Sequence, residues 1–326
     1  MTPIRAGVWG VGVWGEKHAR VYHALPEAEL VGVFDQDPAR AREVAARHDA
    51  RVFDSAAALL EACEAVSIAV PTVHHRAAVE QAAAAQRHIL GEKPMAVTVA
   101  EADAMIAAAE RAGVVLQVGQ LERFNPALLA VRPLVTAPKF IEAHRLALFQ
   151  PRSLDIDVVF DLMIHDIDAV LHLVGAAPET ISAVGVAVLS RNEDIANARL
   201  EFANGCVANL TASRVSRERM RRIRFFQSDS YLAIDLLDKT AEMLKLDVSK
   251  FRPEAPHEAI RQGRLEVGAG EPLTLELAAF LRSLAGAGAG AASAADGREA
   301  LRVAEEVRAG MKRRASQWAI SASGVS

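Results

Sequence analysis

The chain has 326 residues, of which 51% are hydrophobic and 24% are charged, a composition that is typical of globular proteins and excludes a disordered chain. Its 37 basic and 41 acidic side chains give a net charge of −4, so no basic surplus indicates nucleic acid as a partner. The two cysteines, Cys63 and Cys206, are too few for a disulfide-stabilised secreted scaffold, and no apolar run approaches the ~20 residues of a membrane span. We therefore expect a soluble, cytoplasmic protein of two domains that binds neither membranes nor nucleic acid.

Residues 1–120 alternate between short apolar runs and segments rich in Ala, Glu and Arg. The runs predict strands at Ile4–Trp9, Leu30–Phe34, Ala65–Val70, His88–Leu90 and Val114–Val118. The segments between them predict helices, among them Pro38–His48, Ala77–Ala85 and Val99–Ala112. Because strands that alternate with helices form parallel βαβ units, we expect an α/β domain with a doubly wound sheet.

The rhythm changes in residues 121–326, where several strands follow one another. We predict strands at Phe140–Leu148, Ile181–Leu189, Ile195–Phe202, Cys206–Ser213, Ile223–Gln227 and Tyr231–Leu236, with helices at Asp161–Val174 and about 298–314. This order favours an α+β domain with an open, mainly antiparallel sheet, whose closing helix packs back on the first domain. Apolar side chains alternate along Val184–Leu189, which suggests that a second subunit covers the sheet in a homodimer or homotetramer.

The first predicted strand runs into a glycine-rich turn, Gly10-Val11-Gly12-Val13-Trp14-Gly15. The pattern G-x-G-x-x-G after a strand and before a helix is the fingerprint of dinucleotide-binding Rossmann domains. Its glycines allow a tight turn, a close approach to the pyrophosphate and close packing of helix on strand. The alternative is a glycine-rich turn without a ligand.

Asp35 ends the second strand, 20 residues after Gly15, where a carboxylate accepts hydrogen bonds from the adenosine ribose. The same charge repels a 2′-phosphate, so we expect NAD in preference to NADP, although Arg40 and Arg42 lie nearby in sequence. The alternative role for Asp35 is a turn residue or helix cap. Thr72 and His75 follow the fourth strand at the edge where such sheets bind ligands, and His75 is equally compatible with a plain helix start.

Two segments carry the predicted chemistry. Lys93 follows the strand His88–Leu90 in Gly91-Glu92-Lys93-Pro94, where its ammonium can donate to a hydroxyl or carbonyl oxygen near the nicotinamide. In the predicted helix Asp161–Val174, Asp161 and His165 are four residues apart on one face, which suits an imidazole base oriented by a carboxylate. Structural roles compete for each residue: a helix cap for Asp161 and a core histidine for His165. Asp168 is as compatible with a buried structural role as with catalysis, and Asp166 points away.

In these motifs and in others along the chain, the sequence resembles the Gfo/Idh/MocA oxidoreductases. The resemblance rests on GVWGVGVWGEKHAR, GEKP, QVGQLERFNP, DLMIHDID and DGREALRVAEE, and it spans nearly the whole chain. It implies a Rossmann domain, an α+β domain that forms dimer or tetramer contacts, and oxidation of sugar or cyclitol hydroxyls. By matched motif, Lys93, Asp161 and His165 are the catalytic residues, and Glu92, Lys93 and Gln120 join the cofactor site. One departure from the family pattern is Met163-Ile164, where many members have a glycine before the histidine.

Within the family, the second half of the chain resembles bacterial enzymes of nucleotide-sugar metabolism, which implies oxidation of the 3-hydroxyl of UDP-N-acetylglucosamine towards amino sugars of lipid A. Besides Lys93, Asp161 and His165, we expect Arg123, Arg152 and Arg214 to bind this substrate, with Arg145 and Arg217 as further candidates for an anion site. A solvated charged loop explains these arginines about as well. The alternatives are an inositol or simple-sugar dehydrogenase, a non-catalytic NAD-binding regulator, and a metal-dependent hydrolase or isomerase. No metal-ligand motif supports the last of these.

Overall fold

The computed structural model describes residues 2–150, 156–286 and 291–323, and its contacts divide the chain into two compact units. Unit 1 comprises Met1–Phe124 and Gly270–Leu301, and unit 2 comprises Asn125–Ala269 and Arg302–Ser326. We expected domains at 1–120 and 121–326, so the return of Gly270–Leu301 to unit 1 differs from that expectation. The closing helix α9 (Ala294–Ser323) contributes its first residues, to Leu301, to unit 1.

The sheet of unit 1 has seven strands in the order β15-β6-β5-β4-β1-β2-β3. All neighbours are parallel except β15 and β6, and apart from β15 this is the Rossmann strand order. The strands are β1 Ile4–Trp9, β2 Ala28–Phe34, β3 Arg51–Val52, β4 Ala65–Ile68, β5 His88–Gly91, β6 Leu116–Val118 and β15 Ala292–Ser293. The predicted doubly wound sheet is confirmed, although β3 and β15 were not predicted.

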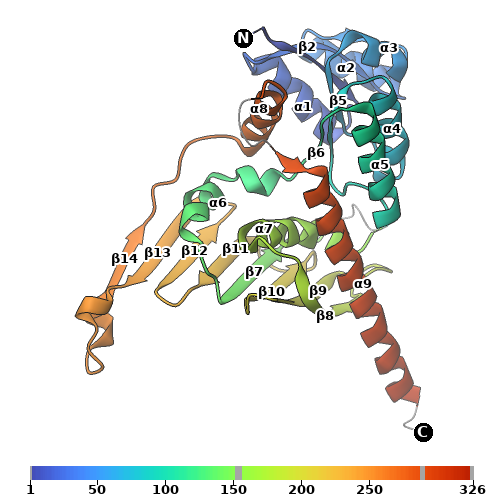
Figure 1. Cartoon of the computed structure of the whole chain (residues 1–326). Coiled ribbons are helices and arrows are strands. Elements are labelled where there is room, and N and C mark those ends of the chain that lie inside the picture. Colours follow the sequence, from blue (N-terminus) through green and yellow to red (C-terminus); the bar gives the residue numbers. More distant parts are fainter. Residues whose placement is uncertain (1, 151–155, 287–290, 324–326) are drawn as a thin grey trace. The chain divides into compact units, whose positions relative to one another are not determined.

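Helices cover this sheet (Figure 1). They are α1 Val13–Ala24, α2 Pro38–Arg47, α3 Ala56–Ala62, α4 His75–Ala84, α5 Val99–Ala112 and α8 Pro272–Leu284, with 3₁₀ turns at Thr72–His74 and Leu121–Phe124. In β1, Gly7 faces Leu59 of α3 and Val8 faces Gly15 of α1. Because successive strand residues point to opposite faces, α1 and α3 cover opposite sides of the sheet.

Unit 1 includes Gly270–Leu301 because α8 is apolar on one side. Leu277, Phe280 and Leu281 of α8 are buried in the same cluster as Val8 and Val33 of the sheet. Burial of apolar surface is the largest favourable contribution to folding, so these side chains hold the returning segment against the Rossmann core. The Ala- and Gly-rich sequence of residues 284–295 is typical of a flexible connector, but α8 continues to Leu284 and β15 joins the sheet; residues 287–290 lie outside the described part.

Unit 2 is built on an eight-stranded sheet in the order β14-β13-β12-β11-β7-β10-β9-β8. Only β7 and β10 are parallel neighbours, which confirms an open, mainly antiparallel sheet. The strands are β7 Phe140–Leu146, β8 Pro178–Val186, β9 Ile195–Phe202, β10 Val207–Ser213, β11 Met220–Phe226, β12 Ser230–Asp235, β13 Thr240–Leu246 and β14 Ile260–Arg264. Helix α7 (Ile164–Val174) contacts β7 and β10, and α6 (Pro126–Val131) contacts β12 and β13 (Figure 1). The strands β13 and β14 were not predicted.

The predicted strand Ile181–Leu189 is too long at its end. Strand β8 stops at Val186, and Asp194 Oδ2 accepts the backbone amides of Val188, Leu189 and Ser190 at 2.8, 2.6 and 2.9 Å. Three amides that converge on one carboxylate oxygen cannot also form a strand ladder, so the segment turns into a loop.

The sheet face opposite α7 is polar over the central strands. Asn197 donates to Thr211 at 2.9 Å across β9 and β10, and Arg224 pairs with Glu142 at 3.3 Å across β11 and β7. Such a face can contact water directly. Exposed apolar side chains gather instead at the edge near the end of β8, at Val186, Val188, Leu189 and Ile195.

Over the described residues, none of the helices combines the length and hydrophobicity that a membrane span requires.

Candidate functional site

The turn between β1 and α1 requires its first and third glycines for steric reasons. Gly10 has φ +86°, and a Cβ there would lie 2.9 Å from the Ala69 carbonyl; a Cβ on Gly15 would lie 1.8 Å from the Gly10 oxygen. In contrast, a Cβ on Gly12 would meet no protein atom within 4 Å. Two glycines therefore close the turn, while Gly12 leaves a space that the protein does not fill.

That space belongs to a cavity of about 610 Å³, a volume typical of cofactor sites. The predicted residues Gly10, Gly12, Val13, Trp14 and Asp35 line it. The walls also include Trp9, Gln36, Ala69, Val70, Pro71, His74, Ala77, Ala78 and Gln81. The cavity lies at the carboxyl ends of β1, β2 and β4, where open α/β sheets bind ligands.

The sequence prediction missed the contribution of α4 to this cavity. His74, Ala77, Ala78 and Gln81 are spaced as one helix face, so the signal was present once the helix start was known. His75, which we had named, is buried: Nε2 lies 2.9 Å from the Val70 oxygen, and Nδ1 contacts the backbone oxygens of residues 94 and 95. Thr72 is half-buried in the preceding turn and is not among the cavity walls.

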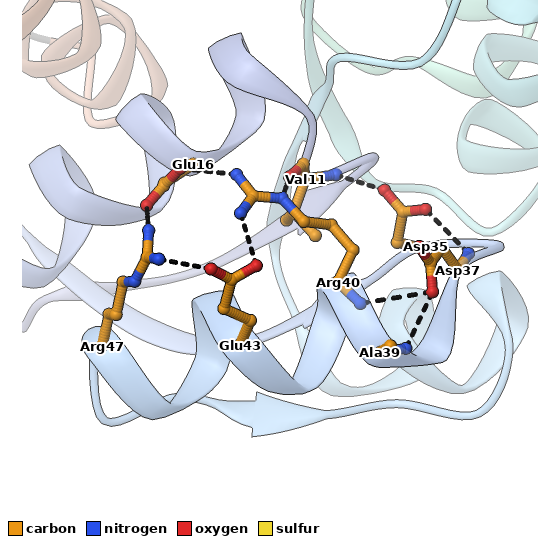
Figure 2. Close-up of polar contacts among 8 residues, drawn as sticks. All are labelled: Val11, Glu16, Asp35, Asp37, Ala39, Arg40, Glu43 and Arg47. Atoms are coloured by element: carbon orange, nitrogen blue, oxygen red, sulfur yellow. Dashed lines mark hydrogen bonds and ion pairs between the residues drawn. The ribbon is translucent and has the colours of Figure 1, made fainter.

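Asp35 joins the glycine loop to the next turn (Figure 2). Its Oδ2 accepts the Val11 amide at 2.6 Å and its Oδ1 accepts the Asp37 amide at 2.9 Å, which fixes the carboxylate at the cavity wall. Each carboxylate oxygen has further acceptor capacity, as a ribose diol requires.

Arg40, which lies close to Asp35 in sequence, is held by other partners (Figure 2). Its Nε donates to the Val11 oxygen at 2.8 Å, and its two terminal nitrogens donate to Glu43 at 2.8 Å and to Glu16 at 2.5 Å. Hydrogen bonds from Arg40 and from Arg47, which also contacts Glu16, lower the pKa of Glu16. The Arg40 guanidinium is therefore neutralised by carboxylates instead of facing a 2′-phosphate.

Lys93 follows β5 and is half-buried, and its neighbour Glu92 is held by a buried histidine. His18 Nε2 lies 2.9 Å from Glu92 Oε1, and Glu92 Oε2 accepts the Lys93 amide at 3.3 Å. Burial opposes ionisation of Glu92, but the hydrogen bond from His18 and the charges of His18 and Lys93 keep its pKa below its usual value. His18 Nδ1 in turn contacts Ser67 Oγ at 2.9 Å, and Tyr22 contacts the same Oγ at 2.8 Å. The sequence prediction did not include His18 as a site residue.

Gln120 follows β6 and is buried, with 2% of its surface exposed. Its Oε1 finds no hydrogen-bond partner among the described residues. A buried amide oxygen without a partner costs about 1–3 kcal/mol, so this atom is suited to accept a hydrogen bond from a ligand.

We predicted that Asp161 and His165 lie on one uninterrupted α-helix, and this prediction is wrong. Val159–Met163 forms a π-helical turn that carries Asp161, and α7 begins at Ile164. From Asp157 to Leu171, Asp161 and His165 are the residues that keep partial solvent exposure while their neighbours are buried. π-Helical turns within helices often occur at functional sites.

Several arginines that we named as substrate ligands have internal partners. Arg214 Nε donates to Asp194 at 2.8 Å, and Arg145 forms a bidentate, buried pair with Asp166 at 2.8 Å for both bonds. Arg123, in unit 1, pairs with the Asp296 carboxylate at 3.3 Å and is 10% exposed. Arg217 is exposed, and Arg152 lies outside the described residues.

Comparisons with known proteins agree with this geometry. Residues 4–120 match the model of an oxidoreductase family with an NAD-binding Rossmann fold, and residues 146–232 match the GFO/IDH/MocA C-terminal domain. UDP-N-acetylglucosamine 3-dehydrogenase from Acidithiobacillus ferrooxidans is 43% identical over 87% of this chain and 90% of its own. A solved structure of that enzyme covers 96% of this chain and 99% of its own, with 41% identity and a TM-score of 0.89. D-apiose dehydrogenase from Paraburkholderia graminis is 32% identical over 66% of this chain and 62% of its own.

Three features match a dinucleotide cofactor: the glycine turn, the open space at Gly12 and the anchored Asp35 carboxylate. Together with two family-model matches and a relative that aligns with most of the chain, they fix the class of protein. The chain belongs to the Gfo/Idh/MocA family of NAD-binding oxidoreductases.

Proposed function

We propose that this protein is an NAD-dependent dehydrogenase that oxidises the 3-hydroxyl of UDP-N-acetylglucosamine to a ketone. The observation that carries the proposal is the 43% identity to a UDP-N-acetylglucosamine 3-dehydrogenase, which extends over 87% of the chain and both units. The anchored Asp35 and the neutralised Arg40 support NAD as the cofactor.

Lys93, Asp161 and His165 are the proposed catalytic residues. The Lys93 ammonium hydrogen-bonds the oxygen of the reacting hydroxyl, and His165 removes its proton while Asp161 orients the imidazole and stabilises its cationic form. Bound NAD supplies the acceptor to which the hydrogen on the same carbon is transferred as a hydride. The products are the 3-keto sugar and NADH, with the hydroxyl proton on His165.

The proposed cofactor site comprises the Gly10–Gly15 turn, Asp35, Thr72, His75, Glu92, Lys93 and Gln120. The unpartnered Gln120 Oε1 supports a hydrogen bond from the carboxamide of the nicotinamide. The backbone contacts of His75 favour a role in shaping the wall, and the adjacent His74 is the better candidate for direct contact.

The proposed reaction also has consequences for the metabolic role, the compartment and the oligomeric state of the protein. A 3-keto nucleotide sugar can be transaminated, and we propose that the product serves amino-sugar synthesis for lipid A in the cytoplasm. The two free cysteines, Cys63 and Cys206, are compatible with a reducing compartment. We propose further that the chain forms a homodimer or homotetramer through the sheet of unit 2, with the exposed Val186, Val188, Leu189 and Ile195 at the contact.

The proposal is tested by incubating the purified protein with NAD and single sugars while the absorbance of NADH is recorded. We expect turnover with UDP-N-acetylglucosamine and none with free glucose, N-acetylglucosamine or myo-inositol, and NMR of the product should place the ketone at C3. Turnover of inositol in preference to the UDP-sugar would favour the second candidate, a cyclitol dehydrogenase, since inositol 2-dehydrogenases are also relatives of this chain at 27–35% identity.

A further inference from the structure

Arg40 lies beside the glycine turn, in the first turn of α2. The helix begins at Pro38, three residues after Asp35. The Nε of Arg40 donates to the Val11 oxygen at 2.8 Å, and the amide of the same valine donates to Asp35 Oδ2 at 2.6 Å (Figure 2). A single residue of the glycine turn therefore connects the Arg40 guanidinium to the carboxylate that we assign to the adenosine ribose.

Two carboxylates hold the other end of this guanidinium. Glu43 Oε2 accepts from Nη1 of Arg40 at 2.8 Å, and Glu16 Oε2 accepts from Nη2 at 2.5 Å. The second oxygen of each carboxylate accepts from Arg47. The four side chains thus form a closed ring between α1 and α2, in which each guanidinium contacts both carboxylates (Figure 2).

The ring occupies the atoms with which an arginine recognises a phosphate. A guanidinium binds phosphate best through two parallel N–H groups on neighbouring nitrogens. All three nitrogens of Arg40 donate to acceptors inside the protein, one to a backbone oxygen and two to glutamates. A fork-like contact with the 2′-phosphate of NADP would therefore have to replace at least one bond of the ring.

The charges drawn in Figure 2 also disfavour a phosphate, even without Asp35. Four carboxylates and two guanidiniums give these side chains a net charge of −2; they are Glu16, Asp35, Asp37, Glu43, Arg40 and Arg47. Replacement of Asp35 by a neutral residue leaves −1. Because like charges repel, the loss of Asp35 alone does not turn this group of side chains into a site for a 2′-phosphate.

We propose that Glu16 and Glu43 are specificity-determining residues of the cofactor site, and that Arg40 is a ligand for a 2′-phosphate which the two carboxylates keep occupied. The preference for NAD then has two sources. Asp35 accepts hydrogen bonds from the ribose, and the glutamates withhold the guanidinium that NADP needs. Neither glutamate is in the cavity wall, so both act through Arg40. The proposal concerns the cofactor and does not depend on which sugar is oxidised.

The test compares Asp35→Ser with the triple variant Asp35→Ser/Glu16→Ala/Glu43→Ala in the full-length protein. Fluorescence titration measures the Kd of NADPH and of NADH. Asp35→Ser alone should lose affinity for NADH and gain little for NADPH. In the triple variant, the Kd of NADPH should fall by roughly ten- to a hundredfold relative to Asp35→Ser, the scale of one gained charged hydrogen bond. The Kd of NADH should change by less than about threefold between the two variants.

Further variants identify the guanidinium that is responsible. Arg40→Ala, added to the triple variant, should remove the gain for NADPH, whereas Arg47→Ala, which deletes the other guanidinium of the ring, should keep it. The control for net charge is Asp35→Ser/Glu61→Ala/Glu64→Ala, which removes two exposed carboxylates at the end of α3 and just before β4. These lie at the amino edge of the sheet, opposite the cavity, so this control should bind NADPH as Asp35→Ser does.

The proposal is wrong if the triple variant binds NADPH no better than Asp35→Ser, or if Arg47→Ala removes the gain as fully as Arg40→Ala. A ring that only joins α1 to α2 would lower the unfolding midpoint in the triple variant and leave the ratio of the two affinities unchanged, which also contradicts the proposal. If the triple variant does not fold, Glu16→Gln and Glu43→Gln replace the two alanines. They keep the shape of the side chains without their charge, and a smaller gain for NADPH supports the proposal, whereas no gain overturns it.

Discussion

His18 Nε2 and Glu92 Oε1 lie 2.9 Å apart, and this contact connects the helix after the glycine turn to the segment that carries Lys93. Glu92 Oε2 in turn accepts the Lys93 amide at 3.3 Å. His18 is 1% exposed, so the carboxylate has a fixed partner on its buried side. His18 is thus a positioning residue for the segment Gly91–Pro94, and it acts through Glu92 instead of touching the reacting atoms.

Replacement of His18 should therefore change the pH dependence of the reaction. In His18→Ala, burial of Glu92 acts without the opposing hydrogen bond, so the pKa of Glu92 should rise. We expect kcat to fall and its acidic limb to move to higher pH, whereas His18→Gln, which can still donate to Glu92, should recover part of both. The exposed His23→Ala on the same helix is the control. An acidic limb at the same pH in His18→Ala would contradict this role.

Gly12 and Gly15 should respond to the same substitution in opposite ways. Gly15→Ala forces a Cβ to within 1.8 Å of a backbone oxygen and should destabilise unit 1 by several kcal/mol or prevent folding. Gly12 has φ −63° and ψ −156°, and its Cβ would meet no protein atom, so Gly12→Ala should leave thermal unfolding unchanged. Because that Cβ would occupy the cavity, the Kd of NADH should rise about tenfold or more, as fluorescence titration can measure. Unchanged NADH binding in Gly12→Ala would remove the turn from the cofactor site.

Asp35 should determine the choice between NAD and NADP. In Asp35→Ser, the loss of a charged acceptor for the ribose should lower kcat/KM for NAD by roughly 10–100-fold, and the use of NADP should improve relative to NAD. Asp37→Ser is the control, because Asp37 caps α2 through the amides of Ala39 and Arg40 and does not line the cavity. The control should keep nearly the wild-type stability, because serine also caps helices, and it should keep the wild-type preference. Equal changes of preference in both variants would argue against a ribose contact at Asp35.

Lys93 should be required for turnover, although as one of several residues of the cofactor site it should contribute little to the affinity for NAD. Lys93→Ala removes the proposed hydrogen bond to the reacting oxygen and should lower kcat by at least ~10²-fold, the usual scale for a positioned acid–base group. The Kd of NADH should stay near the wild-type value. Lys17→Ala, which removes a lysine that stacks on Trp14, is a suitable control for kcat. A Lys93→Ala variant that turns over at the wild-type rate would exclude Lys93 from the chemistry.

Asp194 should make the stability of the protein fall in acid. Burial alone would raise the pKa of Asp194, but hydrogen bonds from Ser190, the Leu189 amide and Arg214 lower it below its usual value. A carboxylate whose pKa is lowered by folding stabilises the folded state at any pH above the pKa that it has in the unfolded chain, about 4. That stabilisation is lost as the pH falls below this value towards the pKa of the folded state. Urea unfolding should show Asp194→Asn to be less stable by roughly 3 kcal/mol at neutral pH and less sensitive to acid, with the exposed Asp229→Asn as control. If Asp194→Asn and the wild type lose stability equally as the pH falls, Asp194 is not the cause of the loss of stability in acid.

The sequence was sufficient for features that short-range physics decides. The predicted bounds of β1 and α5 agree with the structure, because alternating or helical apolar spacing is a local property and Gly113 supplies the left-handed turn that ends α5. The glycine turn was equally predictable, since the steric need at Gly10 and Gly15 arises within a few residues. Asp35 followed from its distance along a known supersecondary unit.

Long-range contacts decided the rest. Helix α8 belongs to the first unit because Phe280 finds apolar partners far away in the chain, and no local pattern states where a buried face will pack. The arginines show the same limit: Arg145, Arg214, Arg219 and Arg221 look alike in sequence, but only folding brings Asp166 to the first and Asp194 to the second. A charge becomes a ligand or a structural partner according to which carboxylate the tertiary structure places beside it. The residue types therefore set the available chemistry, and the fold assigned each of them its role.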